Sequence, residues 1–246
     1  MDARYGYNGF EPWSLVFGMS SKLLDEAISK GDFVEAYRVA KFVLRDEQRA
    51  WDLYTNALDA IGILRYTAAN LKQKGSYEEA AKLFLRCAEF FEGERDYGRA
   101  SGFFLEVGDC FSETGNLEKA KDSFIRGYEL AVQDWRIFGP AKKIASLSVL
   151  LSILITLLSG KPSEAKEIFK LVRSSLPEKE HRKLRRQDHY RLAKHLYDSF
   201  IKENPPKLDD LKSMYAKQEK TDFLTLLEDL SNAYVTVKRF SEKFLK

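Results

Sequence analysis

The segment G-S-Y-E-E-A-A-K-L-F at residues 75–84 returns as G-N-L-E-K-A-K-D-S-F at residues 115–124. In each copy a glycine is followed by an aromatic residue or leucine, an alanine and a phenylalanine, at spacings that place these three on one face of a helix. Each glycine can end one helix in a left-handed conformation at no steric cost, and the next helix begins directly after it. The pattern predicts helices joined by tight glycine turns.

The same sequence motif is present at two further places. Residues 31–36 read G-D-F-V-E-A, and residues 160–165 read G-K-P-S-E-A, with Phe169 four residues on. Successive glycines of the four copies are 44 (31 to 75), 40 (75 to 115) and 45 (115 to 160) residues apart. This regularity predicts an all-α fold, namely a right-handed superhelical solenoid of antiparallel helix pairs with about eleven helices.

The motif is absent after Leu176-Pro177, and this change suggests how the chain is organised. We expect helical repeats with an N-terminal aromatic segment over residues 1–177, and a C-terminal helical cap, continuous with the solenoid, over residues 178–246. A terminal unit needs a polar outer face, so its sequence differs from that of the inner units. Within the cap we expect one charged helix over 178–203, ending before the prolines that follow, and further helices at about 208–217 and 222–244.

The small and aromatic residues at the centre of the chain lie where tetratricopeptide repeats place their packing residues: Tyr77, Ala80, Phe84, Gly108, Phe111, Ala120 and Phe124. The longer period, and the run R-A-S-G-F-F-L-E-V-G-D-C-F at residues 99–111, resemble the soluble NSF attachment proteins (SNAPs). That resemblance implies an adaptor that grips a helical bundle of SNARE proteins and recruits a hexameric AAA ATPase. The chain departs from the family at its end, S-E-K-F-L-K, which is basic where SNAPs are acidic and leucine-rich.

The composition is typical of a soluble globular protein, because 44% of the residues are hydrophobic and 31% are charged. A net charge of +3 is too small to imply nucleic acid by itself. Two cysteines argue against a secreted scaffold held by disulfides. The N-terminus M-D-A-R-Y-G-Y-N lacks the basic and then apolar pattern of a signal peptide. We expect a cytoplasmic protein, with a peripheral membrane location as the alternative.

No pattern in the sequence indicates catalysis or a bound cofactor. The three histidines, His181, His189 and His195, are eight and six residues apart, so they do not share a helix face as the histidines of a zinc site do. Gly160-Lys161 lacks both the earlier glycine and the directly following serine or threonine of a phosphate-binding loop. We expect a protein that is not an enzyme, with no cofactor, no metal and no small-molecule substrate.

An uncharged run of 17 residues spans 144–160. It is at the lower limit for crossing a bilayer, but it lies in phase with the repeats, which favours a buried central helix. One face carries small and hydroxylated residues spaced by three or four: Ala141, Ala145, Ser148, Ser152, Thr156 and Ser159. This stripe indicates either close approach of a neighbouring helix or a groove wall for a partner helix or peptide. The second explanation makes Ser148, Ser152 and Thr156 candidate partner-binding residues.

A basic segment follows at residues 179–194, with seven lysines and arginines against two carboxylates. One interpretation is a surface for the phosphates of nucleic acid or anionic lipid, with Arg182, Arg185 and Arg186 as candidate contacts. The other is the solvated face of an ordinary helix, whose buried side carries Leu184 and Tyr190.

Two smaller features each allow two explanations. Phe10, Trp13 and Phe17 either insert into a membrane interface or cover the open end of the first helix pair. Cys87 and Cys110 fall at packing positions on successive helices, where they are either two buried small hydrophobes or, in a hyperthermophile, a disulfide.

The predicted function is that of a non-enzymatic adaptor or scaffold. Its concave face, or one extended edge, binds a helix or an extended peptide of a partner protein. The SNAP resemblance implies a helical bundle as this partner, together with an AAA ATPase. The alternative is a nucleic-acid or anionic-membrane binder that works through residues 179–194. Salt distinguishes the two, because counterion release makes phosphate binding fall steeply as salt rises.

Overall fold

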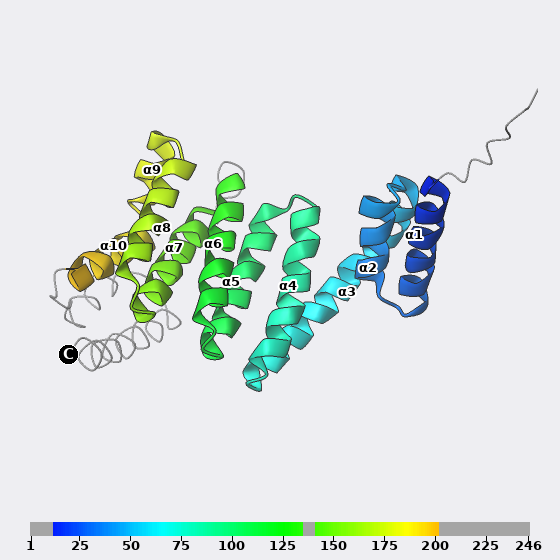
Figure 1. The fold of residues 1–246 in the computed structure, drawn as a ribbon, viewed down its shortest axis with the longest axis horizontal. Helices are drawn as coiled ribbons and strands as arrows, with labels where there is room; N and C mark the ends of the chain where they lie inside the picture. The colour runs from blue at the N-terminus through cyan, green and yellow to red at the C-terminus, as the bar shows by residue number, and fades with distance from the viewer. Residues whose placement is uncertain (1–11, 135–140, 202–246) are drawn as a thin grey trace, which may run out of the picture. The chain divides into compact units, whose positions relative to one another are not determined.

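The computed structural model describes residues 12–134 and 141–201, and these residues form ten α-helices that pack mainly with their neighbours in the chain (Figure 1). The helices are α1 (Pro12–Ser29), α2 (Phe33–Arg38), α3 (Glu47–Gln73), α4 (Tyr77–Gly93), α5 (Tyr97–Glu113), α6 (Leu117–Gln133), α7 (Ala141–Leu158), α8 (Pro162–Ser175), α9 (Glu178–Leu184) and α10 (Asp188–Ile201). A π-helical turn, Val39–Val43, continues α2. The all-α prediction is confirmed for the described residues.

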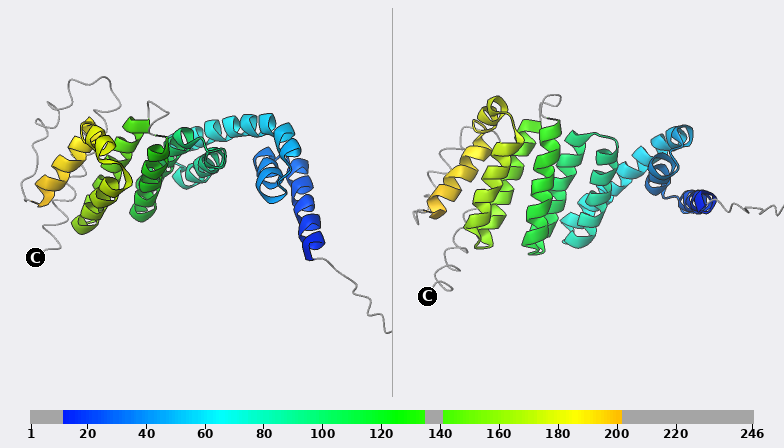
Figure 2. Two further views of the ribbon diagram at one scale, coloured as in Figure 1. Left: turned by 90° about the horizontal axis from the view of Figure 1, so that it is seen from above. Right: turned by 45° about the horizontal axis from the view of Figure 1, so that its top comes forward.

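The chain divides into two compact units, Met1–Thr67 and Ala68–Lys246, so that the division falls inside α3. In the first unit the buried side chains come from α1, α2, the π-helical turn and the first part of α3, among them Leu24, Ala36, Val39 and Ala57. In the second unit α4, α5, α6 and α7 pack in sequence, and α8, α9 and α10 lie around α7. Both views of Figure 2 show α5 and α6 side by side. The expected boundary at residue 177 stays a prediction.

The helices α4, α5 and α6 are three copies of one 20-residue unit. Each helix has 17 residues, and their first residues, Tyr77, Tyr97 and Leu117, are 20 positions apart. Before each helix the chain closes the same turn, in which the backbone N–H of the cap residue donates to a carbonyl five positions earlier, at 2.8–2.9 Å. The donor and acceptor pairs are Ser76 and Leu71, Asp96 and Phe91, and Asn116 and Phe111. This bond is typical of the Schellman turn, which satisfies the last carbonyls of a helix.

The middle copy of this unit is absent from the sequence pattern described above, because Arg95 stands where the other copies have glycine. Its φ of 58° is left-handed, like the 80° of Gly75 and the 74° of Gly115. The residues after Arg95 match the motif, since Ala100 and Phe104 are buried in α5 as Ala80 and Phe84 are in α4. From α4 to α6 the motif therefore begins every helix rather than every second helix.

We expect Arg95→Gly to raise the free energy of unfolding by about 0.5–1 kcal/mol. A side chain with a Cβ is strained in the left-handed region by roughly 1–2 kcal/mol, and part of this gain is offset because glycine has more freedom in the unfolded chain. Urea denaturation followed by circular dichroism measures the change. The reciprocal Gly115→Arg should be destabilising although a Cβ added at Gly115 would have no atom within 4 Å. Equal stability of both variants and the parent would contradict left-handed strain.

The prediction of a single charged helix over 178–203 is wrong. The structure has two helices there, α9 and α10, separated at residues 185–187. The N–H of Arg186 donates to the carbonyl of Lys183, and that of Gln187 to Leu184, so the first helix ends in a tight turn. Leu184, before the turn, and Leu192, after it, are both fully buried in the same hydrophobic core. Helices expected at 208–217 and 222–244 lie outside the described residues.

The apolar run of residues 144–160 forms most of α7. Val149, Leu150 and Ile153 are buried in the core that α7 shares with α6, α8 and α10. Among the described residues, no helix is long and apolar enough to span a membrane. The apolar character of the run is accounted for by packing on several sides.

Candidate interaction surfaces

The first unit carries a row of four aromatic side chains, which we call the aromatic surface: Phe42, Tyr37, Tyr54 and Trp51, of which Tyr37 is itself buried, at 4% exposure. Trp51 is 73% exposed, and its ring stacks on Tyr54 with centroids 6.1 Å apart and planes 6° apart. Tyr54 in turn lies 5.6 Å from the ring of Tyr37. Phe42, in the π-helical turn, is 47% exposed. The row thus joins side chains from α2, the π-helical turn and α3 of this unit.

Lys41 holds one end of the aromatic surface in place. Its ammonium group lies 5.3 Å from the ring centroid of Tyr37 and 5.5 Å from that of Phe42. The same group donates a 2.7 Å hydrogen bond to the Tyr37 hydroxyl. A cation–π contact such as that with Phe42 contributes on the order of 0.5–1 kcal/mol at an exposed site, whereas Tyr37 is held by the hydrogen bond to its hydroxyl. The exposed rings are therefore ordered by their neighbours, as binding anchors are.

The π-helical turn presents Phe42 to solvent. The N–H of Leu44 donates to the carbonyl of Val39, five residues back, which widens the helix by one residue. While Val39 and Ala40 stay buried, Phe42 and Val43 are exposed. Single π turns of this kind are frequent at functional sites.

Exposed apolar side chains are concentrated in the first unit. Seven of the nine large hydrophobic residues that are exposed in the described part of the chain lie between Met19 and Tyr66. They are Met19, Leu23, Phe42, Val43, Trp51, Ile63 and Tyr66. Single exposed hydrophobic residues are ordinary, whereas contiguous apolar patches mark interaction sites. Of the seven, Trp51 has its ring stacked on a neighbouring aromatic ring, that of Tyr54.

None of the sequence motifs marks the aromatic surface, although the sequence carries a signal for it. Within α3 the buried residues Ala50, Leu53, Ala57, Ile61 and Ala68 recur at helical spacing and define one face. Two aromatic residues of the same helix, Trp51 and Tyr66, fall off that face and are exposed. A large aromatic residue away from the apolar stripe of a helix is the feature that would have identified the surface.

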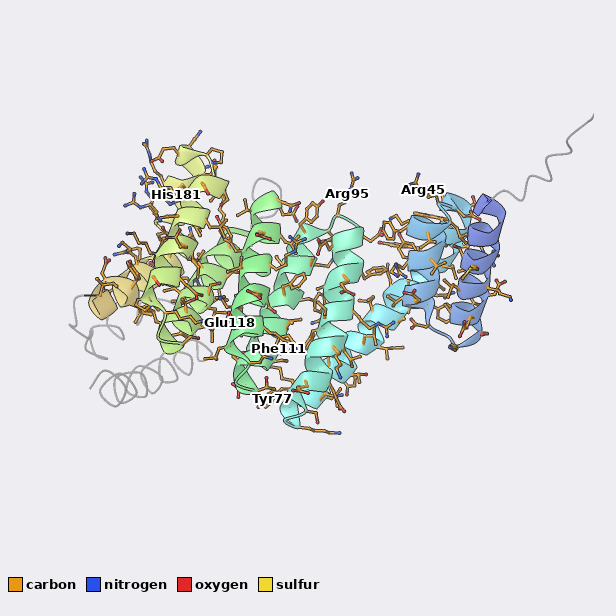
Figure 3. The ribbon with its side chains drawn as sticks, in the orientation of Figure 1. Arg45, Tyr77, Arg95, Phe111, Glu118 and His181 are labelled. Carbon is orange, nitrogen blue, oxygen red and sulfur yellow. The ribbon has the colours of Figure 1, made fainter. Side chains whose placement is uncertain are left out.

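The second unit carries a basic surface on α8, α9, the turn after α9 and α10. Its exposed residues are Arg173, Lys179, Arg182, Arg185, Arg186 and Arg191. The predicted contacts Arg182, Arg185 and Arg186 are therefore all at the surface. Arg182 forms an ion pair with Glu178 at 3.1 Å. Figure 3 shows nitrogen-tipped side chains gathered around α9, close to the labelled His181.

The stripe of small residues on α7 lies at helix contacts rather than on a surface. Ser148, Ser152 and Thr156 are buried, at 0–1% exposure. Ser152 donates to the carbonyl of Ser148, and Thr156 donates to that of Ser152, so these two hydroxyls are satisfied within their own helix. Ser148 faces α6 where Gly127 stands. This placement corresponds to the close approach of helices.

We expect Ser148→Ala to raise the free energy of unfolding by about 1 kcal/mol. The Ser148 hydroxyl is buried and has no hydrogen-bond partner, and an unpaired buried polar group costs about 1–3 kcal/mol. Thermal unfolding of the variant measures the gain. The control is Ser152→Ala, which removes a hydroxyl that is already bonded and should not be stabilising. A loss of stability in Ser148→Ala would contradict the unpaired hydroxyl.

The remaining candidate residues are buried packing residues, belong to α1, or lie outside the described residues. Cys87 and Cys110 are not joined by a disulfide and have fully buried side chains, and burial raises the pKa of Cys110 to about 11. They therefore match the buried small hydrophobes of the first explanation. Phe10 lies outside the described residues, while Trp13 and Phe17 fall within α1.

The described residues contain no cluster of three or more side chains suited to a metal ion. Comparison with known proteins finds no family model that matches the chain and no matching curated protein.

Proposed function

We propose that the protein is a non-enzymatic interaction adaptor, which binds a helical or extended segment of a partner protein through the aromatic surface. The observation that carries this proposal is the exposure of Trp51, 73%, in a ring that is nevertheless held against Tyr54. Tryptophan and tyrosine dominate the binding energy of protein interfaces, because each buries a large area at a small cost in side-chain entropy. An ordered exposed tryptophan is therefore poised for a partner.

The equal units of α4, α5 and α6 support the wider architectural part of the proposal. Stacked helices of constant length that pack on their chain neighbours are what a tetratricopeptide-like right-handed superhelix would contain. Under the SNAP resemblance, the partner segment belongs to a SNARE-type helical bundle, an AAA ATPase joins the complex, and the adaptor works in the cytoplasm. These partners are part of the proposal and are tested separately below.

Affinity capture with the full-length protein tests the aromatic surface. Immobilised parent protein, Trp51→Ala and Phe42→Ala are exposed to lysate of the source cells at low and high salt, and bound proteins are identified by mass spectrometry. The expected result is a salt-resistant partner that both variants lose. Leu171→Ala is the matched control, since Leu171 is the exposed hydrophobic residue of α8 in the other unit.

Two outcomes separate the parts of this proposal. If the same proteins are captured by the parent and by both aromatic variants, the aromatic surface is not the binding site. An AAA ATPase that is captured with the partner and released on ATP turnover supports the SNAP-like role. Capture of a partner without an AAA ATPase supports an adaptor that does not act as SNAPs do.

A further inference from the structure

The cations of α9 lie on the outer side of the helix. The N–H groups of residues 185 and 186 donate to carbonyls four and three residues back, so the helical path continues to Arg186. Along this path Lys179, Arg182 and Arg186 are spaced by three and four residues, which places them on one side, and all three are exposed. The other side carries His181 and Leu184, which are buried. Folding therefore separates a basic side of α9 from its packed side.

The carboxylates near this surface are already paired. Residues 161–201 contain eleven lysines and arginines and six carboxylates, a net charge of +5, so the other residues of the chain together carry −2. Lys179, Arg185 and Arg186 form no ion pair with any residue that the structure describes. Positive charge on this surface is therefore available to an anionic partner. The six carboxylates, each in an ion pair, are Glu164, Glu167, Glu178, Glu180, Asp188 and Asp198.

The shape of α9 favours an extended ligand over a single small anion. A helix is a cylinder, so cations on its outer side diverge instead of enclosing a ligand. Arg185 and Arg186 lie on the turn after α9, and the exposed Arg191 lies beyond that turn, on α10. The cations are thus spread over consecutive elements, and such an arrangement matches an array of phosphates.

We propose that the basic surface docks the protein on an anionic membrane, where Lys179, Arg182, Arg185 and Arg186 contact lipid phosphates. The headgroups of a bilayer form a plane, and each lysine or arginine close to an anionic plane strengthens binding about fivefold. A guanidinium group also donates paired N–H bonds that match phosphate oxygens. The attraction decays within a Debye length, about 10 Å at 0.1 M salt, so this docking is reversible.

The surroundings of the cations favour a membrane over nucleic acid. Proteins that bind single strands stack the bases on aromatic side chains, but among the side chains that the structure describes in α8, α9 and α10, no aromatic ring is exposed. The helix α9 has seven residues, which corresponds to a length of about 10 Å. Duplex binders place a helix or a strand pair in a groove and contact the backbone on both sides of it. A lipid plane requires only that the cations are accessible.

Membrane docking goes beyond the proposed function and does not rest on it. The aromatic surface belongs to the first unit, and the basic surface belongs to the second. Substitutions can therefore remove one binding activity and leave the other. A protein with both activities would hold a partner segment at a membrane.

Vesicle sedimentation with the full-length protein tests the docking. The vesicles contain phosphatidylcholine alone or phosphatidylcholine with phosphatidylserine. Binding is expected only with phosphatidylserine, and it should fall as salt rises. Arg185→Gln combined with Arg186→Gln should lower the partition coefficient by about fivefold for each cation removed. Equal binding to both kinds of vesicle, or no binding to either, overturns the proposal.

Two matched variants separate a docking surface from diffuse attraction. Lys74→Gln combined with Lys82→Gln removes the same charge from exposed positions elsewhere in the second unit, so the partition coefficient should change by less than about twofold. Arg185→Lys combined with Arg186→Lys keeps the charge and should also stay within about twofold of the parent. Circular dichroism shows whether each variant keeps its helices. A loss as large in either of these two variants as in the glutamine variant overturns docking through the basic surface.

Two further measurements distinguish this docking from other activities. Trp51→Ala should bind phosphatidylserine vesicles as the parent does, whether or not the aromatic surface binds a partner. If Trp51→Ala abolishes vesicle binding, the membrane contact lies on the first unit and the proposal fails. Fluorescence anisotropy with single-stranded and duplex oligonucleotides tests the other anionic polymer. Tight oligonucleotide binding that the glutamine variant loses, without binding to phosphatidylserine vesicles, overturns the proposal in favour of nucleic acid.

Discussion

Gly108→Ala should lower the free energy of unfolding by about 2 kcal/mol, and with it the melting temperature by about 4–8 °C. A Cβ built on Gly108 would lie 2.4 Å from Cε1 of Phe124, well inside van der Waals contact. Phe124, on α6, is 1% exposed and belongs to a packed cluster, so its ring cannot swing into solvent. The contact between α5 and α6 must open, or the ring must leave its rotamer.

Gly102→Ala is the matched control for this prediction. Gly102 lies in the same helix, and a Cβ added there would meet nothing within 4 Å. Replacing glycine by alanine inside a helix gains about 1 kcal/mol when there is room, so this variant should be more stable than the parent. The loss at Gly108 occurs in spite of that gain. Two variants of one chemistry are thus expected to change stability in opposite directions.

A second change at Phe124 tests the cause of the loss. Phe124→Leu alone leaves a cavity and should be destabilising by about 1 kcal/mol or more. In the Gly108→Ala background the smaller side chain makes room for the new methyl group, so part of the stability should return. Urea denaturation of the four proteins gives the coupling energy directly. Additive losses would mean that Gly108 and Phe124 are not in contact.

The helical character of the chain could be predicted from its sequence because the packing residues repeat. Ala80 and Phe84 occupy the same positions in α4 as Ala120 and Phe124 do in α6, and all four are buried. Spacings of three and four residues reveal such a face without any knowledge of the partner helix. Glycine adds the turns, since few other residues adopt a positive φ.

Two departures from the sequence prediction have the same physical origin. Arg95 adopts a φ of 58° against its intrinsic preference, so tertiary packing of α4 and α5 decides its conformation. No glycine or proline follows the end of α9 at Leu184. The turn at 185–187 forms because both flanking helices bury a leucine in one core. Local propensity carries no information about either choice.

The candidate surfaces could be predicted only in part. A run of lysine and arginine indicates a basic surface, and Arg185 and Arg186 are indeed exposed. The exposed Arg173 lies outside that run, on α8, so the run by itself did not include it. The stripe of Ser148, Ser152 and Thr156 identified a helix contact, but the sequence could not say which neighbour lay against it.

The second large effect is expected at that contact, where Gly127→Val should lower the free energy of unfolding by about 3 kcal/mol. A Cβ on Gly127 would lie 3.3 Å from the backbone carbonyl oxygen of Ser101, on α5, and 3.3 Å from the Ser148 hydroxyl oxygen, on α7. The methyl groups of valine extend beyond that Cβ. The Ser101 carbonyl can give way only if the backbone of α5 moves, whereas the Ser148 hydroxyl belongs to a side chain that is confined between packed helices.

Asp122→Val separates this crowding from the poor helix propensity of valine. Asp122 is an exposed residue of the same helix, so its replacement should change stability by no more than about 0.5 kcal/mol. Adding Ser148→Ala to Gly127→Val removes one of the two obstructing oxygens, so the gain should exceed the roughly 1 kcal/mol expected of Ser148→Ala alone. The carbonyl of Ser101 still obstructs the side chain, so the recovery should stay incomplete. A gain equal to that of Ser148→Ala alone would assign the crowding to α5, and unchanged stability of Gly127→Val would show that the three helices do not approach as closely as Gly127 permits.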